Sequence, residues 1–506
     1  MSSFSRAVLF STVSSLALAA CTVAPKPLTK LEIASNARSH LRQVTAKQEP
    51  VTGPISLYEA MARALKYNLD HRVGAMDAAL RIKELDLAHF SMLPNAVASS
   101  GYAARDRYSA SRSQNILTGQ ESLAFSTSQE KRILTADVSF SWNVLDFGLS
   151  YVRAKQAADK YLIADEMRRK VVHRVIEDVR TAYWRAVSAD RLIVRLQRLE
   201  KRVRRAQVRS RAISSERRTS PITAVTYERE LVQIKRTIQE LQRDLSVAKT
   251  QLSALMNLKP GTPYRLAPGA KSGRLRLVLP VKEMVWTAMN HRSELREVWY
   301  RRRINDWEVE AALLELLPGL TPYAGTNFDS NDFLYNSHWL SWGAKASWNL
   351  IKVFQYPVKR DVIKAQDKLY RQRALAVTMA VITQVHVSRV RFFHHRREYQ
   401  TAREYLNVQR RLVSLMRKES RAGRISEQTL IREELNTLVA EAKRDISYAA
   451  LQNAFANVYA SMGLDPYPHM KPATLDVQTL ARDLRSVWVE RGDMAAGRWA
   501  PRLARR

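Results

Sequence analysis

Histidine and cysteine are common metal ligands and catalytic side chains, and this chain of 506 residues has ten histidines and one cysteine. His394-His395 is a histidine pair in an arginine-rich stretch with helical spacing. A metal site on a helix needs further ligands three or four residues away, and no histidine or cysteine follows at that step. We therefore expect no catalytic, cofactor-binding or metal site, and we expect that the protein is not an enzyme.

The single cysteine, Cys21, is placed for another kind of chemistry. Arg6 gives a positive start, and the apolar run from Ala7 to Leu18 is too short to span a membrane. The run ends in Leu18-Ala19-Ala20-Cys21, which resembles the bacterial lipobox, whose cysteine is acylated and becomes the first mature residue. We expect a lipoprotein signal peptide at 1–20 and palmitate on Cys21. The alternative is an ordinary signal peptide with a chance cysteine.

The charge of the chain is extreme, since 82 Lys and Arg face 48 Asp and Glu for a formal net charge of +34. Such an excess is typical of nucleic-acid-binding proteins. That function needs a cytoplasmic address, which the export signal argues against. Thr22, not Asp, follows Cys21, and by resemblance to lipoprotein sorting this favours the outer membrane of a bacterial cell. With one cysteine no disulfide can form within the chain, and no other run is long and apolar enough for a transmembrane helix.

Two stretches, Leu134–Phe147 and Trp342–Leu350, alternate between apolar and polar residues. A period of two predicts strands with one apolar and one polar face. Each contains the same tripeptide, Ser141-Trp142-Asn143 in the first and Ser347-Trp348-Asn349 in the second. We expect Trp142 and Trp348 to be membrane-interface aromatics, with carbohydrate stacking as the alternative.

An internal repeat extends around these strands. A shift of 224 residues brings Glu59 onto Glu283 and Leu93-Pro94 onto Leu317-Pro318. A shift of 206 residues superimposes the two Ser-Trp-Asn tripeptides. The difference of 18 residues falls in the loop that joins the two strands of each half, so we expect a surface loop there.

Each half also carries helical sequence. A helix is predicted from Ser56 to about Phe90, and a very long one from about Ser150 to Arg211, which would span roughly 90 Å. A break follows, and a return helix with a heptad seam runs to Asn257. The second half repeats this pattern, with its break at Ala422-Gly423-Arg424.

These signals predict six segments. They are the signal peptide at 1–20, a lipid-anchored tether at 21–54, a first repeat at 55–262 (strands about 96–107 and 133–145, helical hairpin about 150–257), a linker at 263–280, a second repeat at 281–466 (strands about 320–328 and 340–350, hairpin about 357–462) and a basic C-terminal tail at 467–506.

Four strands cannot close a barrel, and open strand edges cannot face lipid. Several copies could pool their strands into one barrel, which the helical hairpins would continue as a tube.

The ordered set of motifs resembles the outer-membrane efflux (TolC) family, over residues 55 to 466. The matching residues are Leu57-Tyr58-Glu59-Ala60, Leu93-Pro94, Ser141-Trp142-Asn143, Asp146-Phe147-Gly148, Ala182-Tyr183-Trp184, Ser293-Glu294-Leu295-Arg296, Leu317-Pro318 and Ser347-Trp348-Asn349-Leu350.

The resemblance implies a mostly helical, internally duplicated chain with a small membrane β-barrel. It implies a homotrimer with a twelve-stranded barrel in the outer membrane, continued by a periplasmic α-helical tunnel of roughly 100 Å. The implied partners are a periplasmic adaptor protein and an inner-membrane pump of RND, ABC or MFS type, for efflux or type I secretion. Two departures are Ile351-Lys352-Val353-Phe354, where the first half has Asp-Phe-Gly, and a first hairpin turn without glycine.

The hairpin turns are rich in arginine, and the resemblance makes them the periplasmic entrance and the adaptor-docking surface. The residues expected there are Arg211, Arg217, Arg218, Ser220, Arg421, Gly423, Arg424 and Ser426. The helix leading to the first turn adds many cations against Glu200 and Glu216, and the second turn has Glu419 alone. Well-known family members carry acidic rings in this region. We expect here a positive entrance that favours anions. The alternatives are a solvated outer face that docks an acidic adaptor, and a mere drift of the composition toward arginine.

Two function classes remain open. The first is a passive export duct in the outer membrane, without nucleic acid as a partner. The second is a basic coiled-coil scaffold or nucleic-acid-binding protein whose N-terminus only resembles a signal. The alternating strands and the lipobox favour the first, because a scaffold needs neither.

Overall fold

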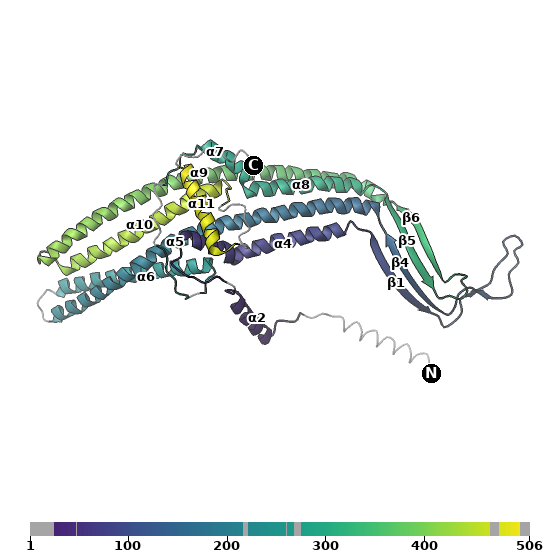
Figure 1. Cartoon of the computed structure of the whole chain (residues 1–506), viewed down its shortest axis with the longest axis horizontal. Helices are drawn as coiled ribbons and strands as arrows, with labels where there is room; N and C mark the ends of the chain where they lie inside the picture. Colours follow the sequence, from purple (N-terminus) through teal and green to yellow (C-terminus); the bar gives the residue numbers. More distant parts are fainter. Residues whose placement is uncertain are drawn as a thin grey trace.

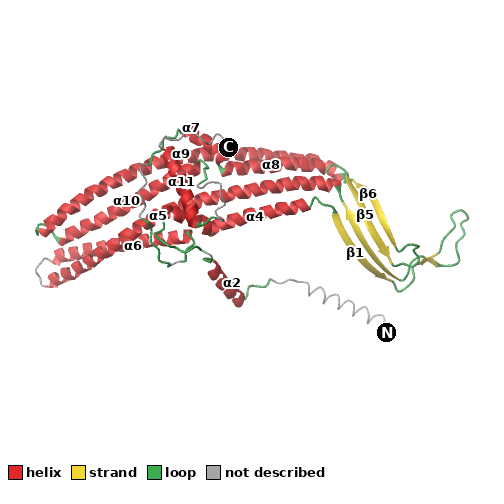
Figure 2. Cartoon of the chain, in the orientation of Figure 1, coloured by secondary structure: helices red, strands yellow, loops and turns green. Residues whose placement is uncertain are grey.

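The computed structural model describes residues 25–46, 48–215, 221–259, 261–267, 275–465 and 475–495. Long helices run along the molecule, with a sheet at one end and helical hairpin turns at the other (Figure 1). Helices dominate the chain, as Figure 2 shows. Among the described residues, none of the helices combines the length and the apolar character that crossing a membrane requires.

The sheet is antiparallel and has the order β1-β4-β5-β6. Its strands are β1 (Asn95–Ala104), β4 (Arg132–Ser141), β5 (Gly319–Asp329) and β6 (His338–Ser347). Two short strands, β2 (Ala110–Ser111) and β3 (Ser126–Thr127), pair in the connection between β1 and β4. Each half of the chain thus supplies two strands, and β1 and β6 are the open edges.

The helices repeat in the same order in both halves. The first half has α3 (Leu57–Tyr67), α4 (Leu69–Phe90), α5 (Val144–Ser215) and α6 (Pro221–Leu255), and the second has α7 (Val281–His291), α8 (Ser293–Leu314), α9 (Ile351–Arg421) and α10 (Glu427–Ser461). A shift of 224 residues maps α3 and α4 onto α7 and α8, and a shift of 206 maps β4 and α6 onto β6 and α10. The predicted internal duplication is therefore confirmed at the level of whole elements.

The predicted helix from Ser56 to Phe90 is wrong in one respect, because it breaks at Asn68. That residue has an extended backbone, and its side chain accepts a hydrogen bond from the backbone N–H of His71, which starts α4. The strands also end earlier than expected, at Ser141 and Ser347, because an asparagine two residues later begins the next helix.

The helices α4, α5, α8 and α9 form a wall in that order, since each packs against the next. The wall therefore has α4 at one edge and α9 at the other. Because α4 leads into β1 and α9 follows β6, the edges of the wall continue into the edges of the sheet. Beyond the middle of the molecule, α5 with α6 and α9 with α10 form the two hairpins.

The segment predicted as a tether contains a helix, α2 (Lys30–Gln43), none of whose side chains is buried. Its start is fixed by a capping box, in which Thr29 and Glu32 exchange hydrogen bonds between side chain and backbone. Asn257 holds its far end, through a hydrogen bond of 2.6 Å to the carbonyl of Val44.

The segment predicted as a basic tail contains α11 (Val477–Ala495), which packs across the waist of the molecule against α3. The sequence analysis missed this packing because the segment shows only weak periodicity. Trp488 of α11 lies between two guanidinium groups, those of Arg180 at 4.2 Å and Arg491 at 4.8 Å from its ring. Burial lowers the pKa of each arginine to about 10.

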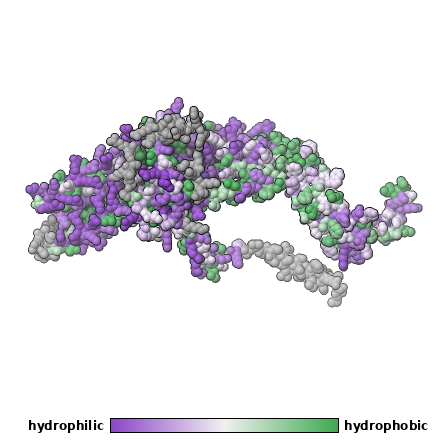
Figure 3. Space-filling view, in the orientation of Figure 1, coloured by the Kyte–Doolittle hydropathy of each residue, from purple (hydrophilic) through white to green (hydrophobic). Residues whose placement is uncertain are grey.

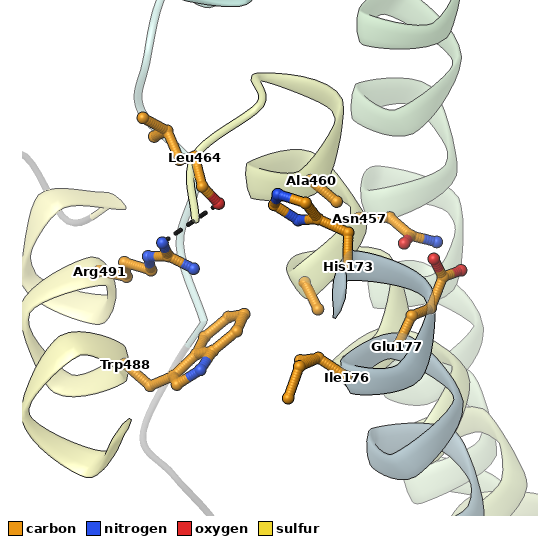
Figure 4. A pocket seen from close by; sticks show the side chains of 9 residues that line it. His173, Ile176, Glu177, Asn457, Ala460, Leu464, Trp488 and Arg491 are labelled. Atoms are coloured by element: carbon orange, nitrogen blue, oxygen red, sulfur yellow. Dashed lines mark hydrogen bonds between the residues drawn. The ribbon is translucent and has the colours of Figure 1, made fainter. Parts of the chain in front are cut away.

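A small pocket remains beside Trp488, between α5, α10 and α11 (Figure 4). Arg491 donates a hydrogen bond across its rim to the carbonyl of Leu464. Close by, burial would raise the pKa of Asp465, but His173 at 3.3 Å and the charge of Arg169 lower it to about 2. The bond from Arg491 ties α11 to the segment after α10, and Asp465 ties that segment to α5.

Candidate channel wall and entrance

The sheet has one apolar and one polar face, as the alternation predicted. The register aligns Ala96, Phe140, Ala324 and Trp342 side by side across all four strands. The apolar face also holds Ala98, Tyr102, Leu134, Val138, Leu320, Phe328, Leu340 and Ala344. The large members of this face are all exposed in the single chain.

The polar face is held by hydrogen bonds between strands. Asn327 donates to the hydroxyl of Ser341 at 2.8 Å, and Ser99 bonds Asp137. Tyr323 lies directly over Gly343, where an added Cβ would meet its hydroxyl oxygen at 2.7 Å. Glycine at this position leaves room for the ring. The polar face consists mostly of serine, threonine, asparagine and charged side chains, with Val97, Ile133 and Trp339 as its larger apolar members.

The duplicated Ser-Trp-Asn tripeptide forms the joint between sheet and helices. The indole N–H of Trp142 donates to the carbonyl of Met92 at 3.3 Å, and that of Trp348 donates to the carbonyl of Leu316 at 2.9 Å. Both acceptors precede a Leu-Pro pair by one residue, at the point where the preceding helix ends. The tryptophans therefore tie the far end of one strand to the start of its partner.

The asparagines of the same tripeptide start the long helices. The side-chain oxygen of Asn143 accepts from the backbone N–H of Leu145 at 3.0 Å, and that of Asn349 accepts from Ile351 at 3.2 Å. A role for Trp142 and Trp348 at a membrane interface stays a prediction.

A ladder of ion pairs joins the two hairpins toward their turns. Arg195, Arg202 and Arg209 of α5 lie seven residues apart, and they pair with Glu441, Glu434 and Glu427 of α10, which have the same spacing. Since the two helices run antiparallel, an arginine seven residues later in α5 pairs with a glutamate seven residues earlier in α10.

Two rungs of this ladder have a second arginine from α9. Arg410 lies 2.9 Å from Glu441, and Arg417 lies 3.1 Å from Glu434. The Glu441 side chain is only 3% exposed, whereas both of its arginines are about half exposed. Each carboxylate thus lies between two guanidinium groups from different hairpins, and that of Glu441 is buried.

The acidic residues of α10 were missed by the sequence analysis, which weighed the charges of each turn only against its neighbours in sequence. The signal was present as the shared seven-residue spacing of arginines and glutamates, but spacing alone does not say which helices meet.

The second hairpin turn is described in full. Gly423 has a positive φ of 70°, which glycine adopts without strain, and Ser426 caps α10 by accepting from the backbone N–H of Thr429 at 3.2 Å. Arg424 pairs with Glu419 at 3.3 Å, and Arg421 is exposed. At the first turn, Arg211 pairs with Glu228 of α6. Arg217, Arg218 and Ser220 lie outside the described residues, as does Cys21.

Ion pairing reduces the expected positive charge of the entrance without removing it. Within the described part of the hairpins, the exposed cations without an ion pair include Arg198, Lys201, Arg205, Arg229, Arg411, Lys418 and Arg421. In Figure 3 the surface at this end of the molecule is mostly hydrophilic.

The histidine pair lies beside a carboxylate of its own helix. His395 lies 2.8 Å from Glu398, a carboxylate three residues further on that the sequence analysis overlooked. Among the residues that the structure describes, no group of three or more candidate ligands could hold a metal ion.

Comparison with protein-family models gave no match, and comparison with curated proteins gave no significant one. Solved structures do match. The CmeC outer membrane channel of Campylobacter jejuni superposes with a TM-score of 0.62 at 12% identity, covering 88% of this chain and 95% of that one. The MtrE outer membrane channel of Neisseria gonorrhoeae, in its open state, gives 0.61 at 14%, covering 88% and 98%.

A third match is CusC, solved in a study of transmembrane channel formation, with a TM-score of 0.61 at 14% identity, covering 83% of this chain and 96% of CusC. The chain therefore has the fold of these channels, as its resemblance to the TolC family predicted.

The joint can be tested with Trp348→Phe, which replaces the indole with a phenyl ring and so removes the hydrogen bond to the carbonyl of Leu316. We expect a loss of about 1 kcal/mol, because the carbonyl loses its donor, and a lower midpoint in thermal unfolding. Trp342→Phe is the matched control, since the indole of Trp342 is 81% exposed and donates no hydrogen bond in the structure. Equal shifts for the two variants would contradict the role of Trp348.

The ladder can be tested with Glu441→Gln, which removes a charge shared by Arg195 and Arg410. We expect a loss of about 1 kcal/mol, discounted for the solvent around the arginines, and faster amide hydrogen exchange in α5 and α10 near the turns. Glu419→Gln is the control, because its one ion pair joins groups that are both exposed. Equal rates of amide hydrogen exchange in the two variants would mean that the ladder does not stabilise the packing of α5 against α10.

Proposed function

We propose that the protein is a passive duct in the bacterial outer membrane. In this proposal its sheet forms part of a membrane barrel, and its helices form a tunnel through the periplasm. The observation that carries the proposal is the sheet, whose apolar and polar faces are both exposed in one chain and span all four strands. Lipid would cover the apolar face, and water would fill the space along the polar one.

The open edges support assembly from several copies. The edge strands β1 and β6 leave backbone donors and acceptors unpaired, which lipid cannot satisfy. The edge helices carry apolar stripes that nothing covers. On α4 they are Leu69, Val73, Met76, Leu80 and Leu87, and on α9 they are Ile351, Val358, Val362 and Leu369.

If the α4/β1 edge of one copy meets the α9/β6 edge of the next, the backbone groups of both edge strands are paired and the apolar stripes of both edge helices are covered. Because the two edges differ, such contacts are head-to-tail and close into a ring. Three copies would give twelve strands, within the range of outer-membrane barrels, and a tunnel walled by twelve helices. The similarity of fold to outer membrane channels supports this arrangement.

We further propose partners at the far end of the tunnel. A periplasmic adaptor would dock on the hairpin turns, which include Gly423, Arg424 and Ser426, and an inner-membrane pump would supply the driving force. Transport by the duct itself needs no chemistry, which agrees with a chain proposed not to be an enzyme.

Lipid attachment at Cys21 and assembly can be tested together. We expect palmitate label in the outer-membrane fraction, on a species that migrates as a trimer in an unboiled gel and as a monomer after boiling. Cys21→Ala should abolish the label, since the chain has no other cysteine. A soluble, unlabelled monomer would remove the duct proposal and favour the basic scaffold instead.

We propose that the entrance favours anions, because unpaired cations such as Arg198, Arg205 and Arg411 would repeat around the ring. The expected result is an anion-selective reversal potential for the trimer in a planar bilayer under a salt gradient. Replacing these three residues with glutamine should shift the reversal potential toward zero, and less so at high salt. A cation-selective trimer would contradict the proposed anion preference of the entrance.

A further inference from the structure

The connection between β1 and β4 forms a long arm that the opposite connection lacks. The arm, residues 105–131, extends beyond the sheet and contains β2 and β3 (Figure 1). At its tip Ile116 is 99% exposed and Leu117 95%, and on the returning side Leu123 and Phe125 are exposed too. The end of the arm is accordingly coloured hydrophobic in Figure 3.

The arm is an ordered element in spite of this apolar surface. At the tip the side-chain oxygen of Asn115 accepts from the backbone of Leu117 at 3.0 Å, and Gly119 donates back to the carbonyl of Asn115 at 2.8 Å. Along the stem, Arg112 covers one face of the Phe125 ring at 4.5 Å. The turn and the stem therefore hold the apolar side chains out in water.

The base of the arm is fastened to the connection between β5 and β6. Asn331 of that connection donates to the carbonyl of Ser128 at 2.9 Å and accepts from the backbone of Glu130 at 3.1 Å. Asn331 is itself buried. The direction of the arm is thus set by contacts within the chain.

The connection between β5 and β6 carries exposed apolar residues of its own. Phe333 is 57% exposed and Tyr335 is 99% exposed, although they lie near the same end of the sheet. Within one chain the arm does not cover them. Each chain therefore presents two apolar groups at this end, one on the arm and one on the short connection.

The strand order decides what lies beside each group. The arm begins at β1, which is an open edge, and the short connection ends at β6, which is the other open edge. In a ring where β6 of one copy pairs with β1 of the next, the short connection of the first copy stands next to the arm of the second. This step rests on the proposed ring.

We propose that the arm locks neighbouring copies together at the outer end of the barrel. Leu123 and Phe125 of the arm pack against Phe333 and Tyr335 of the adjacent copy, whereas Asn331 of the same chain fixes the base. The second copy is the occupant that continuity with the paired edges favours, and burial of both groups removes apolar surface from water on each side.

The test is a pair of cysteines, Leu123→Cys with Tyr335→Cys, in the full chain purified from membranes. We expect a bismaleimide linker to convert the monomer band of a boiled gel into covalent dimers and trimers. Each single variant is the matched control, and it also reports any reaction of Cys21. Neither single variant should form more than a trace of dimer.

Three results would overturn the inference. They are no cross-link in trimers that still conduct ions, a cross-link confined to the monomer band, and dimers from Leu123→Cys alone, which would mean that arms meet one another. The first result would leave the proposed duct intact, since conductance reports it separately. Loss of the trimer in the unsubstituted chain would overturn both proposals.

A second measurement keeps the result independent of the linker. Leu123→Ser and Tyr335→Ser, singly and combined, should lower the temperature at which trimers dissociate, and the combined shift should be smaller than the sum of the single shifts. Additive shifts would mean that the two residues do not contact each other.

Discussion

The rest of the structure depends on backbone groups at the sheet edges that find no hydrogen-bond partner within one chain. Strands β1 and β6 each leave one side of the ladder unpaired, and no water is present in a hydrocarbon layer to satisfy those groups. The same two edges continue into α4 and α9, which leave apolar stripes uncovered. A single chain therefore leaves two edges unpaired, one formed by β1 with α4 and the other by β6 with α9.

Local sequence patterns were sufficient to predict the repeated parts of the fold. The period of two in β4 and β6, the long helical runs and the two shifts all appear as elements with nearly the expected bounds. The alternation even gave the correct face for Trp342 and Phe140. These features depend on neighbours in the sequence, which is why periodicity reveals them.

Contacts between distant segments could not be predicted in the same way. The arginines of α5 suggested an unshielded positive entrance, yet Glu427, Glu434 and Glu441 approach from a helix more than two hundred residues later in the chain. Similarly, the periodicity of α11 is too weak to predict a packed helix, and Trp488 is stabilised by one arginine from α5 and by another three residues further along its own helix. Positions of charge can be read from a sequence, but their partners depend on the fold.

The proposed head-to-tail ring has a genetic consequence. In that ring, a copy with a damaged β6/α9 edge would keep a sound β1/α4 edge, so it would still join its neighbour and then block closure of the ring. In a cell that makes equal amounts of intact and damaged copies, only about one ring in eight of three copies would be free of damage. Edge variants of this chain are therefore expected to be dominant, whereas variants that prevent folding altogether are expected to be recessive.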